Sequence, residues 1–156
     1  MLFLIFSLGN DRYVVDATRT VEILPLVNWK SLPGAPRGVA GIIDYRGNPT
    51  PLLDLSELSV GKPCRKVMST RIIIINYQDS DPPRLLGLLA EGVTGTIRRN
   101  EEDFLTPGLR SDEAPYLGPI ASSPEGSLQR IDIRHLVPGH IHDLLFANSS
   151  EPRNGF

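Results

Sequence analysis

The sequence predicts an all-β fold, either a barrel or a sandwich. Short runs of apolar and β-branched residues recur along most of its 156 residues. Turns rich in glycine and proline, with 14 residues of each type, separate these runs, and only short helices are expected, one of them near the C-terminus. A chain of this length forms one domain, or two small halves that share a core. Its composition, 40% hydrophobic and 22% charged, argues against disorder.

The first predicted element is a buried strand over the apolar residues 2–6. A turn signal at Gly9, Asn10 and Asp11 follows it, and a second strand runs through residues 13–15. The apolar start could also suggest a signal peptide, but no lysine or arginine precedes it. No other apolar run approaches the roughly 20 residues that span a bilayer. We therefore expect two strands here.

A β-hairpin is predicted over residues 39–55. Two apolar runs, Val39–Ile43 and Pro51–Leu55, flank a turn in which Gly47 and Asn48 tolerate a positive φ. The prolines in the second run suit an edge strand, because they lack a backbone N–H. The hairpin therefore presents Arg46 at its tip. A short helical turn should follow, capped by Asp54 or Ser56.

Strand and turn signals also dominate the second half of the chain. A β-branched run predicts a buried strand, and a loop then leads to its hairpin partner. No internal repeat is strong enough to be recognised from the sequence. The predicted strands are residues 71–77, 84–90, 93–98, 115–121 and 128–133, and the final helix is residues 135–147, interrupted by a Pro-Gly pair. We expect one domain over residues 1–146 and a flexible tail over residues 147–156.

Catalytic and metal-binding patterns have little support. His140 and His142 could supply two metal ligands, with His135 nearby, but only Asp143 lies beside them and a zinc site needs further ligands. Cys64, the one cysteine, lies beside cationic residues that could lower its pKa. No nucleotide-binding loop or nucleophile-elbow motif occurs. We expect no enzymatic activity, no cofactor and no metal; a small enzyme that uses Cys64 or the histidines is an alternative.

Charge and aromatic content disfavour nucleic acid as a partner. The net charge is −2, and aromatic residues make up 6% of the chain. An OB-type barrel that binds nucleic acid would need stacking aromatics on a basic face. This remains the second alternative, which a salt-dependent response to oligonucleotides would support.

Several segments, taken in order, resemble the CheW-like family of chemosensory adaptors. They are Glu22–Ile23, then residues 32–43 with the pattern LPGAPRGVAGII, then the Arg46–Gly47 turn before PLLDL. The second half agrees through residues 72–75, 87–93 and 128–136. The resemblance extends from residue 2 to about residue 146.

The resemblance implies two small SH3-like, five-stranded β-barrels around a shared core. It also implies a non-enzymatic adaptor that links the cytoplasmic tips of chemoreceptors to the regulatory domain of a histidine kinase. Further CheW-like chains, or copies of this one, could join in rings. The protein would then be cytoplasmic and reach the membrane only through the receptors.

The residues predicted to bind the receptor or the kinase surround the hairpin. In the family a glutamate and the arginine of the turn act together, and Glu22 and Arg46 match them. Where the family has Asn-Leu-Arg-Gly, this chain has Asp44-Tyr45-Arg46-Gly47, so Arg46 could instead pair with Asp44. The predicted binding residues are Glu22, Val39, Ile42, Ile43, Arg46, Gly47, Leu89 and Val93.

Overall fold

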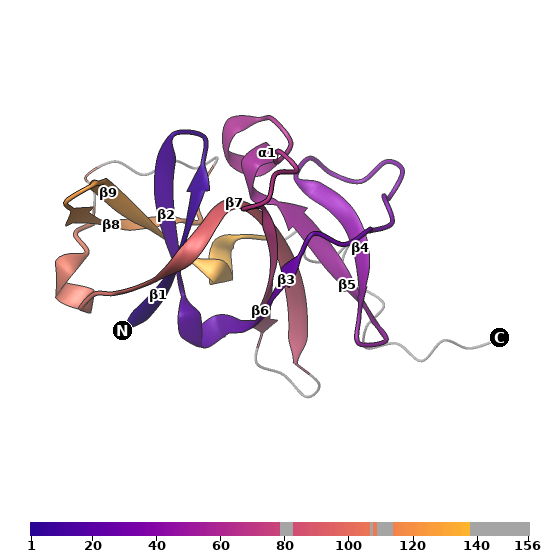
Figure 1. The fold of residues 1–156 in the computed structure, drawn as a ribbon, viewed down its shortest axis with the longest axis horizontal. Helices are drawn as coiled ribbons and strands as arrows, with labels where there is room; N and C mark the ends of the chain where they lie inside the picture. The colour runs from indigo at the N-terminus through magenta and orange to yellow at the C-terminus, as the bar shows by residue number, and fades with distance from the viewer. Residues whose placement is uncertain (79–82, 107, 109–113, 138–156) are drawn as a thin grey trace.

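The computed structural model describes residues 1–78, 83–106, 108 and 114–137, and in these residues the fold is mainly β (Figure 1). Three single-turn 3-10 helices and one short α-helix join the strands. The strands are β1 (Leu2–Leu8), β2 (Asp11–Asp16), β3 (Thr20–Pro25), β4 (Val39–Tyr45), β5 (Asn48–Asp54), β6 (Arg71–Gln78), β7 (Arg84–Arg98), β8 (Leu117–Ser123) and β9 (Gly126–Ile131). The helices are η1 (Ala17–Arg19), α1 (Leu55–Val60), η2 (Glu101–Asp103) and η3 (Ile133–His135).

Strand β7 belongs to both halves of the molecule. Its first part pairs with β6 and, in parallel, with β5, whereas its last part pairs with β1. One half therefore contains β3, β4, β5, β6 and β7, and the other contains β7, β1, β2, β8 and β9 (Figure 1). The prediction of two small five-stranded halves is confirmed. The two strands predicted at 84–90 and 93–98 are one continuous strand, so that prediction was wrong.

The bend of β7 lies at Gly92. This residue has a φ of +58°, and a Cβ there would lie 2.8 Å from Ser7 Oγ. The register between β1 and β7 shifts at the same place, between Ile5 and Ser7. Glycine thus lets β7 turn from one half into the other, because an added side chain would be both strained and crowded.

Each half is completed by an isolated bridge beyond its end strands. In the first half Lys30, on the chain leaving β3, exchanges two backbone hydrogen bonds of 2.8 Å with Ile42 of β4. In the second half Leu105, on the chain leaving β7, does the same with Ile120 of β8, at 2.8 and 2.9 Å.

The two halves repeat one another, a relation not recognised in the sequence. Ile42 and Ile120, which form the two bridges, lie 78 residues apart. Asp54, the last residue of β5, and Asp132, the residue after β9, have the same separation. Parallel pairing is also repeated, since β5 joins β7 as β9 joins β2.

Aspartates cap the helices that follow the β4–β5 and β8–β9 hairpins. The Asp54 carboxylate accepts a hydrogen bond from Glu57 N at the start of α1, and the Asp132 carboxylate accepts one from Arg134 N in η3. Of the two predicted caps for α1, Asp54 is therefore the one used. Of the C-terminal helix predicted over residues 135–147, His135 ends the 3-10 turn η3, and residues 136 and 137 are not helical. Residues 138–156, which include the rest of that prediction and the predicted tail, lie outside the described residues.

The main core lies between the halves and draws on both. It contains Leu4, Phe6, Leu8, Tyr13, Val15, Val39, Leu53, Leu55, Ile73, Ile75, Leu86, Leu88, Ala90, Tyr116, Ile131, Ile133, Leu136 and Val137. Two smaller clusters of buried residues each belong to a single half. The predicted shared core is thus present, and it fixes the strands of one half against those of the other. Within the part of the chain that is described, no helix is long and apolar enough to cross a membrane.

Candidate functional site

The tip of the β4–β5 hairpin is a two-residue turn. Tyr45 and Asn48 form its last strand pair, and Arg46 and Gly47 between them have φ values of +49° and +84°. Two positive φ values in a two-residue loop define a type I′ turn, whose twist matches that of the strands. The predicted turn of Tyr45, Arg46, Gly47 and Asn48 lies where the sequence placed it, with Arg46 at the tip. Gly47 has the expected positive φ, but the other positive φ belongs to Arg46 and not to Asn48.

Arg46 is the only residue other than glycine with a positive φ among those described. This conformation is uncommon for residues with a side chain, and it is retained where the surroundings favour it. The Asp44 carboxylate supports the turn by accepting a 2.8 Å hydrogen bond from Gly47 N. The turn therefore projects the arginine away from the sheet.

Arg46 pairs with Glu22, which lies on β3. Its Nη2 atom is 3.2 Å from Glu22 Oε2. The alternative, a local ion pair of Arg46 with Asp44, does not form, because the Asp44 carboxylate accepts the hydrogen bond from Gly47 N instead. Two segments far apart in the sequence thus meet here, since β3 and β4 are the end strands of the first half.

Tyr45 joins both members of this pair. Its hydroxyl donates a 2.5 Å hydrogen bond to Glu22 Oε2, and its ring lies 5.4 Å from Arg46 Cζ. The pKa of Tyr45 is raised, first by this hydrogen bond and then by burial; the charge of Arg46 acts to lower it and the charge of Glu22 to raise it further. Tyr45 therefore remains a protonated donor at neutral pH. We call Glu22, Tyr45 and Arg46 the tip triad.

The exposed fraction of the side chains in the tip triad rises from Tyr45 through Glu22 to Arg46. Tyr45 is 6% exposed, whereas the side chains of Glu22 and Arg46 are 36% and 75% exposed. The charged groups can thus be reached by a partner while the ring beneath them is anchored. Such an arrangement can orient a partner through charge and hydrogen bonds.

The other predicted site residues differ in their placement. Val39, Ile43 and Leu89 are buried, so they support the site by packing and offer no surface to a partner. Ile42 and Val93 are half-buried, and Gly47 is exposed at the tip.

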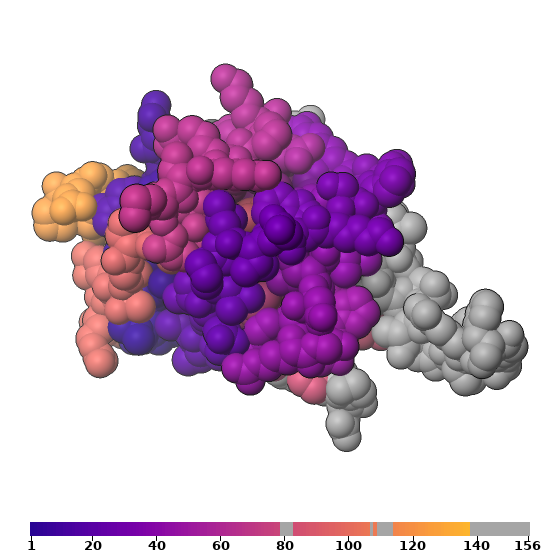
Figure 2. Space-filling view, turned by 45° about the vertical axis from the view of Figure 1, so that its right-hand side comes forward, coloured from indigo at the N-terminus to yellow at the C-terminus, as the bar shows by residue number. Residues whose placement is uncertain are grey.

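Two exposed apolar side chains on β3 were missed. Val21 and Ile23 are 48% and 42% exposed and flank Glu22 on the strand. Figure 2 shows the segment around β3 crossing the middle of one face, with the segment of residues 61–70 above it and the hairpin below. That upper segment adds Met68, which is 93% exposed. The alternation of residues 20–25 was the signal for this strand, since its even and odd positions face opposite sides.

Cys64 is not an activated thiol. Burial raises its pKa, and the nearby Asp54 carboxylate raises it further. The expectation that neighbouring cations could lower this pKa was wrong, because Arg65 turns to Glu91, with 2.7 Å between Nε and Oε1. The thiolate needed by a nucleophile is therefore disfavoured.

The predicted histidine site cannot be assembled from what is described. His135 lies 3.6 Å from Asp132 through Nε2, and it is exposed. His140 and His142 lie outside the described residues. Across residues 1–78, 83–106, 108 and 114–137, no group of three potential ligands could hold a metal ion.

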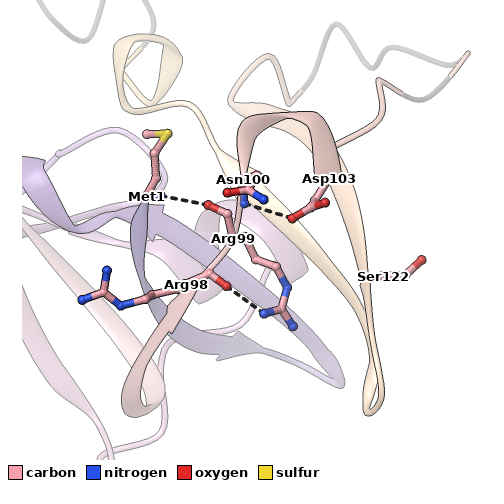
Figure 3. Close-up of a pocket in the computed structure, with 6 residues that line it drawn as sticks. All are labelled: Met1, Arg98, Arg99, Asn100, Asp103 and Ser122. Carbon is pink, nitrogen blue, oxygen red and sulfur yellow. Dashed lines mark hydrogen bonds between the residues drawn. The ribbon is translucent and has the colours of Figure 1, made fainter.

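A polar cavity of about 680 Å³ lies at the far end of β7 (Figure 3). Its polar groups bind one another: Asn100 N donates to Asp103 Oδ2 at 2.9 Å, and Arg99 Nη1 donates to Arg98 O at 2.8 Å. Arg98, Arg99 and Asp103 supply the charged groups of its lining. This arrangement does not resemble a catalytic cleft, since no acid–base or nucleophile pair faces the cavity.

Comparisons with known proteins agree on one family. A family model described as "CheW-like domain" matches residues 2–139. The chemotaxis protein CheW of Klebsiella aerogenes is 26% identical over 137 residues, which cover 86% of this chain and 80% of that protein. The chemotaxis protein CheW of Helicobacter pylori is also 26% identical, over 65% of this chain, and the match spans 59% of that relative's length.

Solved structures include a protein of similar fold. The crystal structure of the scaffolding protein TtCheW from Thermoanaerobacter tengcongensis superposes with a TM-score of 0.73 and 25% sequence identity. The superposition covers 83% of this chain and 82% of that one.

Proposed function

The chain belongs to the CheW-like domain family, and from this we propose that it is a non-enzymatic chemotaxis scaffold that couples chemoreceptor tips to a histidine kinase. Its partners in this proposal are the cytoplasmic tip of a receptor and the regulatory domain of the kinase. Further CheW-like chains could extend the assembly into rings. The scaffold would act in the cytoplasm, and its membrane association would come through the receptors.

The observation that supports this function best is the tip triad. An adaptor needs no perturbed acid or base, but it needs rigid elements that present a few oriented charges. The ion pair of Glu22 and Arg46 fulfils this need, because it joins two end strands above a buried ring. Its role is orientation, since an exposed pair contributes only about 0–1 kcal/mol to stability.

The exposed face of β3 extends the proposed receptor-binding surface. Val21 and Ile23 are exposed apolar side chains on the strand that carries Glu22, on the side of that strand opposite to Glu22. Interfaces commonly combine an apolar centre with polar groups that fix orientation. Because β3 is an end strand, we propose that a receptor segment crosses its edge, packs on these two side chains and is oriented by Glu22 and Arg46.

The two alternative functions receive no support from the site. An enzyme built on Cys64 would need a thiolate, which burial and Asp54 disfavour. A nucleic-acid-binding barrel would need aromatic side chains on a basic face, whereas the tip triad presents one arginine paired with a carboxylate.

The test is a three-component binding experiment. The chain is titrated by calorimetry with the kinase regulatory domain from the same cell, and cosedimented with assembled cytoplasmic receptor fragment. We expect saturable one-to-one binding to the kinase domain in the micromolar range, about −8 kcal/mol. We also expect the chain to bring kinase domain into the receptor pellet.

Matched variants locate the receptor contact. Arg46→Ala should lose receptor cosedimentation and keep kinase binding. Arg134→Ala is the control, because Arg134 is equally exposed at 75% and also pairs with a carboxylate, at 3.1 Å from Asp132. Absence of binding to both partners by the unmodified chain would refute the proposed function.

A further inference from the structure

Tyr45 contacts both charged members of the tip triad, yet its own side chain is almost inaccessible to a partner. We propose that Tyr45 is a positioning residue whose hydroxyl fixes the Glu22 carboxylate in the orientation that the receptor recognises. This inference rests on the proposed function. It assigns the fixed geometry of the pair to the tyrosine and not to the arginine.

The ion pair alone would hold Glu22 poorly. Arg46 is 75% exposed at the end of a turn, and exposed pairs of long side chains are weak because they lose rotamer freedom. Glu22 itself has a flexible side chain and is partly exposed. A carboxylate held only by Arg46 would therefore sample several orientations.

The tyrosine is a more rigid donor. Its ring packs in a cluster with Ile43, Leu52, Ile72, Ile74 and Leu89. Because the ring is anchored there, the hydroxyl has a fixed position. Its 2.5 Å hydrogen bond to Oε2 is much shorter than the 3.2 Å contact of Arg46 with the same atom. A hydrogen bond to a charged group is also stronger than one between neutral groups.

Both contacts fall on one carboxylate oxygen. Oε2 accepts from Tyr45 and Arg46, whereas Oε1 takes neither of these two contacts. The tyrosine ring also lies beneath the guanidinium, at 5.4 Å. Tyr45 thus holds the Glu22 carboxylate through its hydroxyl and contacts the Arg46 guanidinium through its ring. Removing the hydroxyl should therefore release only the Glu22 carboxylate.

A double-mutant cycle in receptor binding tests this role. Tyr45→Phe keeps the ring and removes the hydroxyl, so we expect about tenfold weaker binding to the receptor fragment when Glu22 is present. In the Glu22→Ala background the same substitution should change binding by less than about twofold. The control is Tyr116→Phe, since Tyr116 is also buried and its hydroxyl bonds Ser59 Oγ at 3.0 Å.

A second measurement needs no partner. In a chain labelled with ¹³C at tyrosine Cζ, Glu22→Gln should move the titration of Tyr45 to lower pH, because the raised pKa depends first on the carboxylate. If the titration of Tyr45 does not move in Glu22→Gln, the inference is overturned. This result does not depend on whether the variants of the binding cycle are stable enough to be assayed.

The outcomes separate the two proposals. If the unmodified chain does not bind the receptor, the proposed function fails and this inference fails with it. If it binds and Tyr45→Phe binds equally well, only this inference is overturned. Equal losses in both backgrounds would also overturn it, because Tyr45 would then act through packing and not through Glu22.

Discussion

Gly41 is the residue on which closure of the first half depends. It is the third residue of β4 and has a φ of +154°, and an added Cβ would lie 2.0 Å from the carbonyl oxygen of Lys30. Lys30 N and O are the two atoms that bridge to Ile42. Gly41→Ala must therefore move the chain that leaves β3 away from β4.

The expected cost follows from what this movement breaks. Two hydrogen bonds of 2.8 Å are lost, each worth about 1 kcal/mol net, and groups left unsatisfied cost about 1–3 kcal/mol more. The positive φ of Gly41 adds about 1–2 kcal/mol of backbone strain, so we expect Gly41→Ala to lower the free energy of unfolding by about 4–7 kcal/mol. This is a large share of the 5–15 kcal/mol typical of a domain.

Urea denaturation followed by circular dichroism measures this loss, with Gly47→Ala as the matched control. Gly47 lies in the same hairpin and also has a positive φ, but no atom lies within 4 Å of an added Cβ there. Its alanine variant should lose only the backbone term, about 1–2 kcal/mol. Equal losses in the two variants would refute the reasoning, since the contact with Lys30 would then cost nothing.

Three further predictions concern charged and titratable groups. Arg46→Glu should weaken receptor binding at least about thirtyfold, while the free energy of unfolding falls by no more than about 1 kcal/mol. Arg134→Glu is the control for receptor binding. A large loss of stability in Arg46→Glu would show that Arg46 has a structural role. Cys64 should react slowly with iodoacetamide at pH 7.5 in the folded chain and much faster in urea, because burial and Asp54 raise its pKa; fast labelling of the folded chain would contradict this. Burial acts to raise the pKa of Asp132, but the hydrogen bonds and charge of Arg134 lower it on balance. Its contribution to stability is therefore present above its unfolded pKa of about 3.9 and lost as pH falls through the lower folded value. Stability should fall less steeply with acidification in Asp132→Asn than in the unmodified chain below about pH 4, and identical profiles would exclude this contribution.

Local sequence signals predicted most of the strands. The hairpin at 39–55 was predicted from its apolar runs and turn, and Asp54 was one of two predicted caps. Strand β3 was not predicted, although the alternation of residues 20–25 is typical of a strand, because no turn signal bounds this short segment. The continuity of β7 was missed because Gly92 resembles a strand end, whereas pairing with β1 carries the strand through it.

The site was only partly predictable, because its contacts are not local. The resemblance to a family linked Glu22 with Arg46, and the structure places them 3.2 Å apart. No local pattern shows that Tyr45 reaches Glu22, since this hydrogen bond joins β4 to β3 through the order of strands in space. Burial of Val39, Ile43 and Leu89 likewise depends on packing that period-two alternation alone does not define.

The internal repeat explains how one small chain could serve two different partners. The turn equivalent to Arg46–Gly47 in the second half is Pro124–Glu125. There the tip carries a carboxylate, and Glu125 pairs with Arg12 of β2 at 2.9 Å, so no cation is presented. The two halves thus share their strand arrangement, the closing bridges and the aspartate caps, but the charged side chains at their hairpin turns differ. Because β7 and the shared core hold both halves rigidly, two unlike surfaces are kept in a fixed relation. This is the physical requirement for an adaptor that must place a receptor and a kinase side by side.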